Sequence, residues 1–257
     1  MLVLDVRLPR TVETAEILSL ADLHLGDRRH LRNLLSDIIR WVDASPSRYV
    51  ALNGDLIDNA IRESVGDPYT ATLPPQEQKK LIIETLKPLK DKILLCNVGN
   101  HEERSYKHGG GDPDEDIAMA LDVPYGREGT LLRVEVGYNS KNGTGFVYRI
   151  YFTHGWAGGK RSGSALNAAE ELEHTLDADA YVLGHSHKAG VTYKNFFRYN
   201  PTAASVSKVP HTFVSGGAIM EWGGYAERGG MAPGAERLPF IILDGKRQSS
   251  VEVGWVA

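Results

Sequence analysis

The stretch YVALNGDLID, residues 49–58, carries the signal that decides the fold. Its first four residues are apolar and predict a short buried strand. Asn53, Gly54 and Asp55 follow this strand at once. Glycine suits a sharp turn at a strand end, and the carboxyl ends of strands in α/β sheets are where ligand sites collect. The stretch therefore predicts a buried strand that ends at a polar, ligand-binding turn.

The same arrangement occurs on both sides of this stretch. A strand predicted over residues 15–20 runs into Asp22 and His24, and one over residues 92–98 runs into Asn100, His101 and Glu102. Apolar residues recur at helical spacing over residues 28–43 and 76–89. Alternation of strands and helices predicts a largely parallel sheet with its polar turns at one edge.

The second half of the chain is richer in strands. Predicted strands cover residues 130–136, 145–153 and 180–183, and a helix covers residues 165–176. The strand over 145–153 ends at His154, and the strand over 180–183 ends at Gly184-His185-Ser186-His187. Further strands are expected over residues 191–199, 211–215, 238–243 and 250–255. Two sheets packed face to face fit this pattern better than one, within a single domain over residues 1–257.

Composition narrows the class of protein. The net charge of −4 argues against a general nucleic-acid coat, although it leaves room for a local basic groove. No apolar run approaches the ~20 residues of a membrane helix. Cys96, the only cysteine, lies in an apolar run and is expected in the core. This cysteine usage suits a cytoplasmic protein.

Five short polar blocks follow the predicted strands, and together they form the strongest functional signal. In chain order they are Asp22-x-His24, Gly54-Asp55-x-x-Asp58, Gly99-Asn100-His101-Glu102, His154 and Gly184-His185-x-His187. The chance that this composition produces the whole set is on the order of 10⁻⁴. Their donors are carboxylates, imidazoles and an amide without a thiolate, which suits Mn²⁺, Fe or Zn²⁺ better than a soft metal.

In this order the blocks resemble the signature of the calcineurin-like metallophosphoesterase superfamily. The resemblance implies a four-layer α/β/β/α sandwich of two mixed sheets, with two divalent ions at the strand ends. It also implies three sets of ligands: Asp22, His24 and His187 for the first ion, Asn100, His154 and His185 for the second, and Asp55 as the bridge. Two ions held in this way activate a water molecule that attacks phosphorus near neutral pH. Mn²⁺ is expected first, with Fe, Zn²⁺ or Mg²⁺ as alternatives.

Two further residues acquire catalytic roles from the resemblance. His101 follows the predicted ligand Asn100 and would stand beside the metals, where it protonates the leaving oxygen. Asp58 would orient and charge-stabilise His101, as a carboxylate does for an imidazole acid. Alone, such a histidine is more often a surface or core residue, and Asp58 could instead cap the following segment.

The substrate is predicted less sharply. Arg104 and the pair Lys160 and Arg161 could bind phosphate oxygens, and residues 108–111 are expected to form a loop. The phosphoprotein phosphatases of this superfamily carry an arginine after the second block, where this chain has Asn59. We therefore expect a phosphodiesterase acting on nucleic acid or a nucleotide, with a phosphomonoesterase as the alternative and a catalytically inactive binding scaffold as a third hypothesis. The glycine-rich turn after His154 is similar to small phage and prophage members.

Overall fold

Two six-stranded sheets form the centre of the computed structural model, which describes residues 1–62, 64, 69, 71–141, 143–156 and 159–256. Sheet B contains, in spatial order, β12 (Glu252–Val256), β11 (Leu238–Asp244), β2 (Thr14–Leu20), β3 (Arg48–Asn53), β4 (Ile93–Asn97) and β5 (Tyr125–Gly126). Sheet A contains β1 (Leu2–Arg7), β6 (Thr130–Asn139), β7 (Thr144–Thr153), β8 (Ala180–Leu183), β10 (Ser205–Gly216) and β9 (Ala189–Asn200). Both sheets are mixed: β2 to β5 run parallel, as do β7, β8 and β10, while β11 and β9 pair antiparallel with their neighbours.

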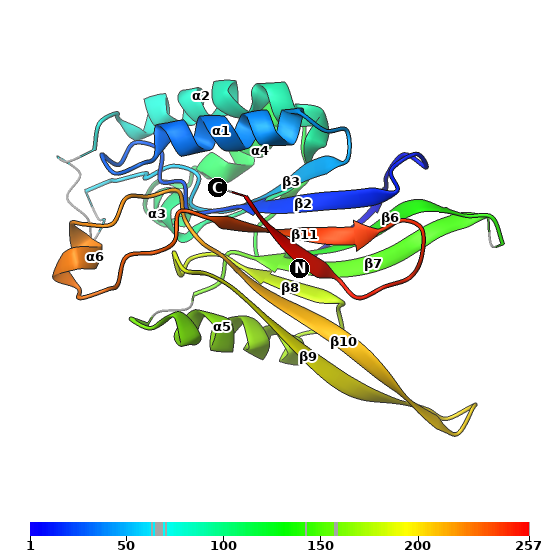
Figure 1. The fold of residues 1–257 in the computed structure, drawn as a ribbon. Coiled ribbons are helices and arrows are strands. Elements are labelled where there is room, and N and C mark those ends of the chain that lie inside the picture. Colours follow the sequence, from blue (N-terminus) through cyan, green and yellow to red (C-terminus); the bar gives the residue numbers. More distant parts are fainter. Residues whose placement is uncertain (63, 65–68, 70, 142, 157–158, 257) are drawn as a thin grey trace.

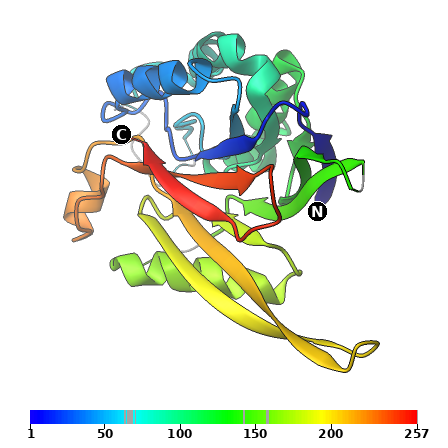
Figure 2. The same ribbon diagram turned by 45° about the vertical axis from the view of Figure 1, so that its right-hand side comes forward.

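Helices cover the outer face of each sheet (Figures 1 and 2). On sheet B lie α1 (Arg32–Asp43), α2 (Pro75–Leu86) and α4 (Pro113–Leu121), whose apolar faces share one core with the outward side chains of β2 and β3. On sheet A lies α5 (Ser162–Glu171), which packs against β8 and β10. The predicted four-layer α/β/β/α sandwich is therefore confirmed.

A third core fills the space between the sheets. Alternate residues of each strand point to opposite faces, so Ile17 and Ala51 face sheet A while Leu18 and Val50 face the helices. Central strands buried on both faces need near-continuous apolar sequences. This double burial explains why residues 49–52 contain no polar position.

Some predicted boundaries were wrong. The helix expected from residue 28 begins at Arg32, because Arg29 and His30 are instead engaged in a turn: the Arg29 side chain bonds Asp27, and His30 Nδ1 lies 2.7 Å from the Leu23 carbonyl oxygen. The loop expected over residues 108–111 is partly helical. The helix α3 (Asn100–Gly109) continues to Gly109, and Gly110 ends it in the left-handed conformation.

The remaining elements complete the chain. They are the 3₁₀ helices η2 (Lys87–Lys92) and η3 (Leu172–His174) and the short helix α6 (Tyr225–Arg228). The hairpin of β9 and β10 extends beyond α5, away from the end of the molecule that carries α3 and α6 (Figure 1). No helix among the described residues is long and apolar enough to cross a membrane.

Candidate metal centre

The predicted metal ligands all follow strands whose carboxyl ends meet at one edge of the sandwich. Sheet B supplies four of them from the segments after β2, β3 and β4, and sheet A supplies three from the segments after β7 and β8. The four from sheet B are Asp22, His24, Asp55 and Asn100, and the three from sheet A are His154, His185 and His187. The two sheets must therefore pack in one fixed arrangement for the seven side chains to meet.

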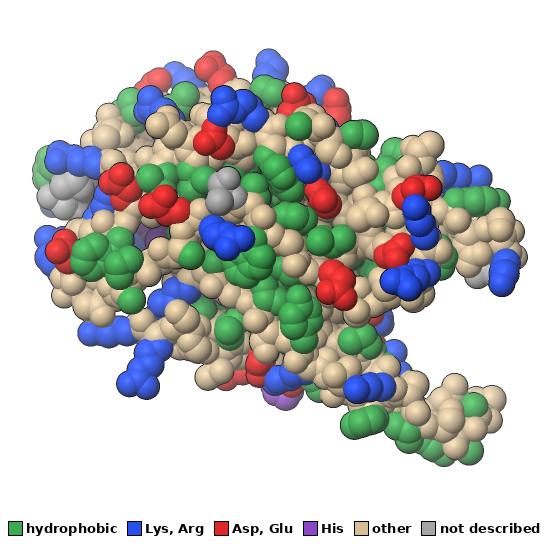
Figure 3. Space-filling view, viewed as in Figure 1, with side chains coloured by type: hydrophobic (Ala, Val, Ile, Leu, Met, Phe, Trp, Pro, Cys, Tyr) green, Lys and Arg blue, Asp and Glu red, His purple; other side chains and the backbone are tan. Residues whose placement is uncertain are grey.

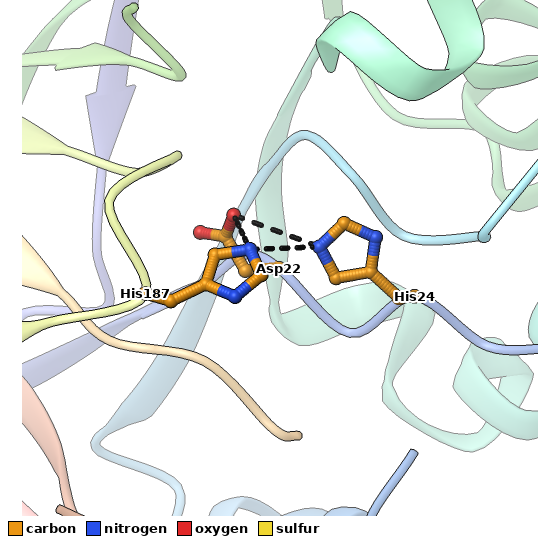
Figure 4. Close-up of side chains that lie close together, drawn as sticks. All are labelled: Asp22, His24 and His187. Atoms are coloured by element: carbon orange, nitrogen blue, oxygen red, sulfur yellow. Dashed lines mark hydrogen bonds and ion pairs between the residues drawn. The ribbon is translucent and has the colours of Figure 1, made fainter. Parts of the chain in front are cut away.

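Asp22, His24 and His187 form the first cluster of donors. Nε2 of His187 lies 3.2 Å from Oδ1 of Asp22 and 3.0 Å from Nε2 of His24. Figure 4 shows the two rings and the carboxylate pointing toward one another. Donors that share one ion at about 2.0–2.2 Å lie about 3.0–3.5 Å apart. These contacts match that spacing, although the His24 Nε2 to Asp22 Oδ1 distance is wider, at 3.9 Å.

Asp55, Asn100, His154 and His185 form the second cluster. Oδ1 of Asn100 lies 3.0 Å from Nε2 of His154 and 2.7 Å from Nδ1 of His185. Oδ2 of Asp55 is 3.3 Å from His154 Nε2 and 3.8 Å from His24 Nε2 of the first cluster. One carboxylate oxygen thus faces donors of both clusters, which is the place of a bridging ligand.

Hydrogen bonding around Asp22 and His154 fits a cation. Oδ2 of Asp22 accepts the backbone N–H of His185 at 2.9 Å, but the buried Oδ1 accepts no hydrogen bond within the described part of the chain. Nε2 of His187 lies 3.2 Å from this oxygen as an ion-pair contact, and a buried oxygen that accepts no hydrogen bond costs about 1–3 kcal/mol, and more when charged. Nδ1 of His154 must donate to the carbonyl oxygen of Asn53, 2.8 Å away, which leaves Nε2 to bind metal.

The backbone at these ligands is strained. Five of them have φ between 45° and 63°, in the left-handed region: Asp22, His24, Asp55, His185 and His187. Aspartate and histidine enter this region more readily than most residues, yet each such position costs of the order of 1–3 kcal/mol. Strain of this kind persists where the surrounding structure enforces it, and it is concentrated at functional sites.

Charges within the metal-free centre compensate one another. Burial alone would raise the pKa of Asp55, but the imidazoles of His154 and His101 hold it well below its ordinary value. Burial lowers the pKa of His154, yet Asp55 outweighs this effect and raises that pKa to about 10. Burial, assisted by His101, holds the pKa of His24 well below its ordinary value. His24 is therefore neutral and ready to bind a cation, whereas His154 has a proton to lose.

His101 lies at the edge of both clusters, in the first turn of α3. Its Nε2 is 3.8 Å from Oδ2 of Asp55, and its ring centroid is 4.3 Å from that of His24. Its Nδ1 lies 2.7 Å from the backbone oxygen of Asp58 and 3.7 Å from Oδ1 of that residue. Since a carbonyl oxygen only accepts, Nδ1 carries a proton and Nε2 points toward the metal ligands.

Sequence comparison supports the same kind of centre. A family model described as calcineurin-like phosphoesterase matches residues 15–189, which include every predicted ligand described above. The chain belongs to the calcineurin-like phosphoesterase family. This family implies a divalent dimetal centre, and the two donor clusters fit it. The resemblance to phage-encoded members stays a prediction.

Solved structures of related fold are distant in sequence. A metallophosphoesterase from Sphaerobacter thermophilus is 12% identical with a TM-score of 0.44, and the match covers 95% of this chain and 88% of that one. The calcineurin-like phosphoesterase YfkN from Bacillus subtilis is 13% identical, with a TM-score of 0.43 and coverage of 94% and 90%. A putative 5′-nucleotidase from Staphylococcus aureus is 12% identical, with a TM-score of 0.46 and coverage of 95% and 54%. No curated protein matches the chain in sequence.

Sequence reasoning missed the buried groups that hold the ligand segments of this phosphoesterase in place. Nδ2 of Asn59 donates to the backbone oxygen of His101 at 2.7 Å. Glu102 accepts the backbone N–H of Ile57 at 2.8 Å, and Asp114 accepts that of Gly99 at the same distance. Burial raises the pKa of Glu102 well above its ordinary value and that of Asp114 to about 8. Glu102 is the last residue of the third block and Asn59 directly follows the second, so the sequence carried a signal for both, although it indicated no supporting role; Asp114 had no such signal.

The predicted phosphate-binding cations occupy two places in the phosphoesterase. Arg104 lies on α3 with Nη1 3.4 Å from Nδ1 of His101. Lys160 and Arg161 are exposed just before α5, and the predicted glycine-rich turn before them lies partly outside the described residues. A further cation, Arg29, went unpredicted: its side chain donates two hydrogen bonds to Asp27 and one to the backbone oxygen of Gly223.

Proposed function

We propose that this phosphoesterase hydrolyses phosphodiesters, with nucleic acid or nucleotides as the substrate class. The observation that carries the proposal is the position of Oδ2 of Asp55, which faces donors of both clusters while His101 stands 3.8 Å away. Phosphoryl transfer needs charge stabilisation and a proton for the leaving group. Metal-binding donors and an imidazole acid at one place could meet both needs.

In this proposal seven residues hold two divalent ions, with Mn²⁺ as the expected metal. Asp22, His24 and His187 hold one ion, Asn100, His154 and His185 hold the other, and Asp55 binds both. When bound, two such ions stabilise negative charge on the attacking and leaving oxygens and lower the pKa of a water molecule. The ligands from sheet B bring the negative charge, and those from sheet A bring neutral imidazoles.

His101 is proposed as the acid that protonates the leaving oxygen. With Nδ1–H held by the backbone oxygen of Asp58, the proton to be delivered sits on Nε2, which faces the ligands. The Asp58 carboxylate, 3.7 Å from Nδ1, stabilises the imidazolium form by its charge. Arg104 is proposed to bind a non-bridging phosphate oxygen beside His101.

The preference for diesters rests on the residue after Asp58. A monoester carries about two negative charges near neutral pH, one more than a diester, so its site should offer an additional cation. Asn59 occupies this position, is buried and donates to the His101 backbone. The second candidate is a phosphomonoesterase. The position of Arg104 beside His101 favours it, because the guanidinium could neutralise the extra charge of a monoester.

The test compares esters with the same leaving group. Protein reconstituted with Mn²⁺ should hydrolyse bis-p-nitrophenyl phosphate with a higher kcat/KM than p-nitrophenyl phosphate, and it should cleave single-stranded DNA. Asp55→Asn serves as the matched inactive control. A clear preference for the monoester would favour the phosphomonoesterase, and no hydrolysis by the metal-loaded protein would favour the inactive binding scaffold.

A further inference from the structure

Two tryptophan side chains lie exposed on the segments next to the candidate metal centre. Trp156 is 68% exposed and Trp222 is 45% exposed. Tryptophan has the largest apolar surface of the amino acids and is mostly buried in folded proteins. Exposed aromatic side chains next to a polar site therefore suggest a surface that binds a ligand.

Trp156 is tied to the centre by the chain itself. It follows His154 by two residues, and Gly155 between them has φ of +79°. A Cβ at Gly155 would collide with the side chain of Leu183 at the end of β8, so the turn there is tight. The chain therefore turns sharply after the predicted ligand His154, and the indole of Trp156 is exposed to solvent.

Trp222 is held near the centre by several contacts. The backbone N–H of Ile219 donates to the oxygen of Asp22 at 3.1 Å, so the segment that carries Trp222 starts beside a ligand. Arg29 then fixes that segment: its backbone oxygen accepts from Glu221, and its side chain donates to Gly223. The indole N–H of Trp222 donates to the oxygen of Met231 at 2.7 Å, which orients the ring.

The two tryptophan segments adjoin each other. A Cβ at Gly234 would lie 3.2 Å from the backbone oxygen of His187, and one at Gly230 would lie 3.5 Å from Nζ of Lys160. The segment after Trp222 thus passes the ligand His187 and reaches the segment that carries Trp156. In Figure 3 a hollow with histidine at its floor lies next to hydrophobic side chains over α6, and side chains of both charges, Lys and Arg as well as Asp and Glu, surround it.

We propose that Trp156 and Trp222 form a stacking site for the base of a nucleotide whose phosphate lies at the metal centre. This inference rests on the function proposed above and narrows its substrate class to esters that carry a nucleobase. Every base presents a flat face to an aromatic ring, so stacking binds bases with little regard to sequence. Lys160, on the segment that carries Trp156 and close to Gly230, is placed to contact further phosphates when the nucleotide belongs to a strand.

Two substrates with one leaving group test the site in Mn²⁺-loaded protein. Thymidine 5′-(p-nitrophenyl phosphate) and methyl p-nitrophenyl phosphate differ only in the nucleoside. The wild type should prefer the nucleoside ester. Trp156→Ala and Trp222→Ala should each lower kcat/KM for that ester roughly 10- to 100-fold, the scale for losing one stacked base, and leave the methyl ester unchanged. Trp156→Phe should restore most of the loss.

Phe197→Ala is the matched control for removing an exposed aromatic side chain. Phe197 is 76% exposed on β9 but lies eight residues beyond its start, roughly 26 Å along the hairpin. The Phe197→Ala substitution should change kcat/KM for neither ester. If the tryptophan variants behave like Phe197→Ala, or reduce both esters equally, the stacking site is overturned.

Binding provides a readout that does not depend on turnover. AMP should quench the tryptophan fluorescence of the protein, ribose 5-phosphate should not, and Trp156→Phe with Trp222→Phe should reduce the quenching. A thymidine octanucleotide that binds much more tightly than thymidine monophosphate identifies a nucleic-acid strand as the source of the base, and equal affinity identifies a free nucleotide. Quenching without hydrolysis of either ester would refute the proposed function and support the stacking site. Hydrolysis without quenching would support the proposed function and refute the stacking site.

Discussion

The two sheets contribute different chemistry to the same edge of the molecule. Sheet B supplies both carboxylates, the amide and His24, and Asp22, Asp55 and His24 are almost fully buried. Sheet A supplies only imidazoles, and the side chain of His187 is 44% exposed. The negative charge of the candidate centre therefore comes from the βα half, and its most exposed predicted ligand, His187, comes from the strand-rich half.

The contacts that surround the predicted ligands differ in the same way: they are more buried on the sheet B side than on the sheet A side. Next to the sheet B ligands, Glu102, Asp114 and Asn59 hold the backbone through buried hydrogen bonds. Next to the sheet A ligands lie exposed segments that carry Trp156 and Lys160. Both halves supply predicted ligands, but the segments after the sheet B strands are held by buried hydrogen bonds, whereas the segment after β7 exposes Trp156 and Lys160 to solvent. Substitutions in the two halves should therefore fail in different ways.

Asp55→Asn should produce the largest effect, because it removes a charge that faces both donor clusters. We expect most of the bound metal and nearly all turnover to be lost, a greater loss than the 10- to 100-fold typical of residues that only support a ligand. Elemental analysis after reconstitution with Mn²⁺ measures the metal, and activity assays measure turnover. Two ions per chain in this variant would rule out Asp55 as the bridge.

His101→Ala should separate metal binding from proton transfer within the sheet B half. Turnover should fall by ~10²–10⁴, the scale for a positioned general acid, with both metals retained. The defect should shrink for p-nitrophenolate, a leaving group that needs no proton. Loss of metal from this variant would instead make His101 a ligand.

Lys160→Ala combined with Arg161→Ala tests the sheet A half. Cleavage of single-stranded DNA should weaken about 10-fold while small diesters change little, because only a polymer brings several phosphates to these exposed cations. The difference should be larger at low salt, since exposed charges are screened within ~8 Å at physiological ionic strength. Equal losses for DNA and small diesters would contradict a role in binding the strand.

Asp114→Asn should produce the smallest effect, confined to stability. Burial raises the pKa of Asp114 from 3.8 to about 8, so the folded chain keeps a proton that the unfolded chain has released. Stability of the metal-free wild type should therefore fall as pH rises through this window. The stability of the variant should fall less steeply with pH. The remaining pH dependence should come from Glu102, whose pKa is also raised by burial.

Urea denaturation near both ends of this pH window measures the difference. Asp116→Asn is the matched control, because Asp116 lies on the same helix but is exposed and pairs with Lys79. Parallel pH profiles for wild type and Asp114→Asn would show that Asp114 does not titrate in this range.

The sequence predicted those features that are determined by residues close to one another along the chain. The strand over residues 180–183 was predicted with the observed bounds, because an apolar run and a polar block define both of its ends. The clusters at the strand ends could be anticipated because parallel strands bring their carboxyl ends to one edge, and the structure places the predicted ligands there. Their individual roles stay predictions.

Features that depend on distant contacts escaped prediction. The strand β1 was missed because its pairing partner, β6, lies more than a hundred residues away along the chain. The start of α3 was obscured because its first turn carries motif residues whose polar character resembles a loop. Arg29 and Trp222 gain their places from a contact between residues 29 and 223, which no local pattern records.

The left-handed backbone at Asp22, His24, Asp55, His185 and His187 has a consequence for how this sequence can change. Glycine enters that conformation without the steric penalty of a side chain. A chain selected for stability alone would therefore be drawn toward glycine at these positions, and each such replacement would delete a predicted metal donor. At these five positions the predicted chemistry and the stability of the backbone conflict, so a programme of stabilising this protein should hold them fixed and work elsewhere.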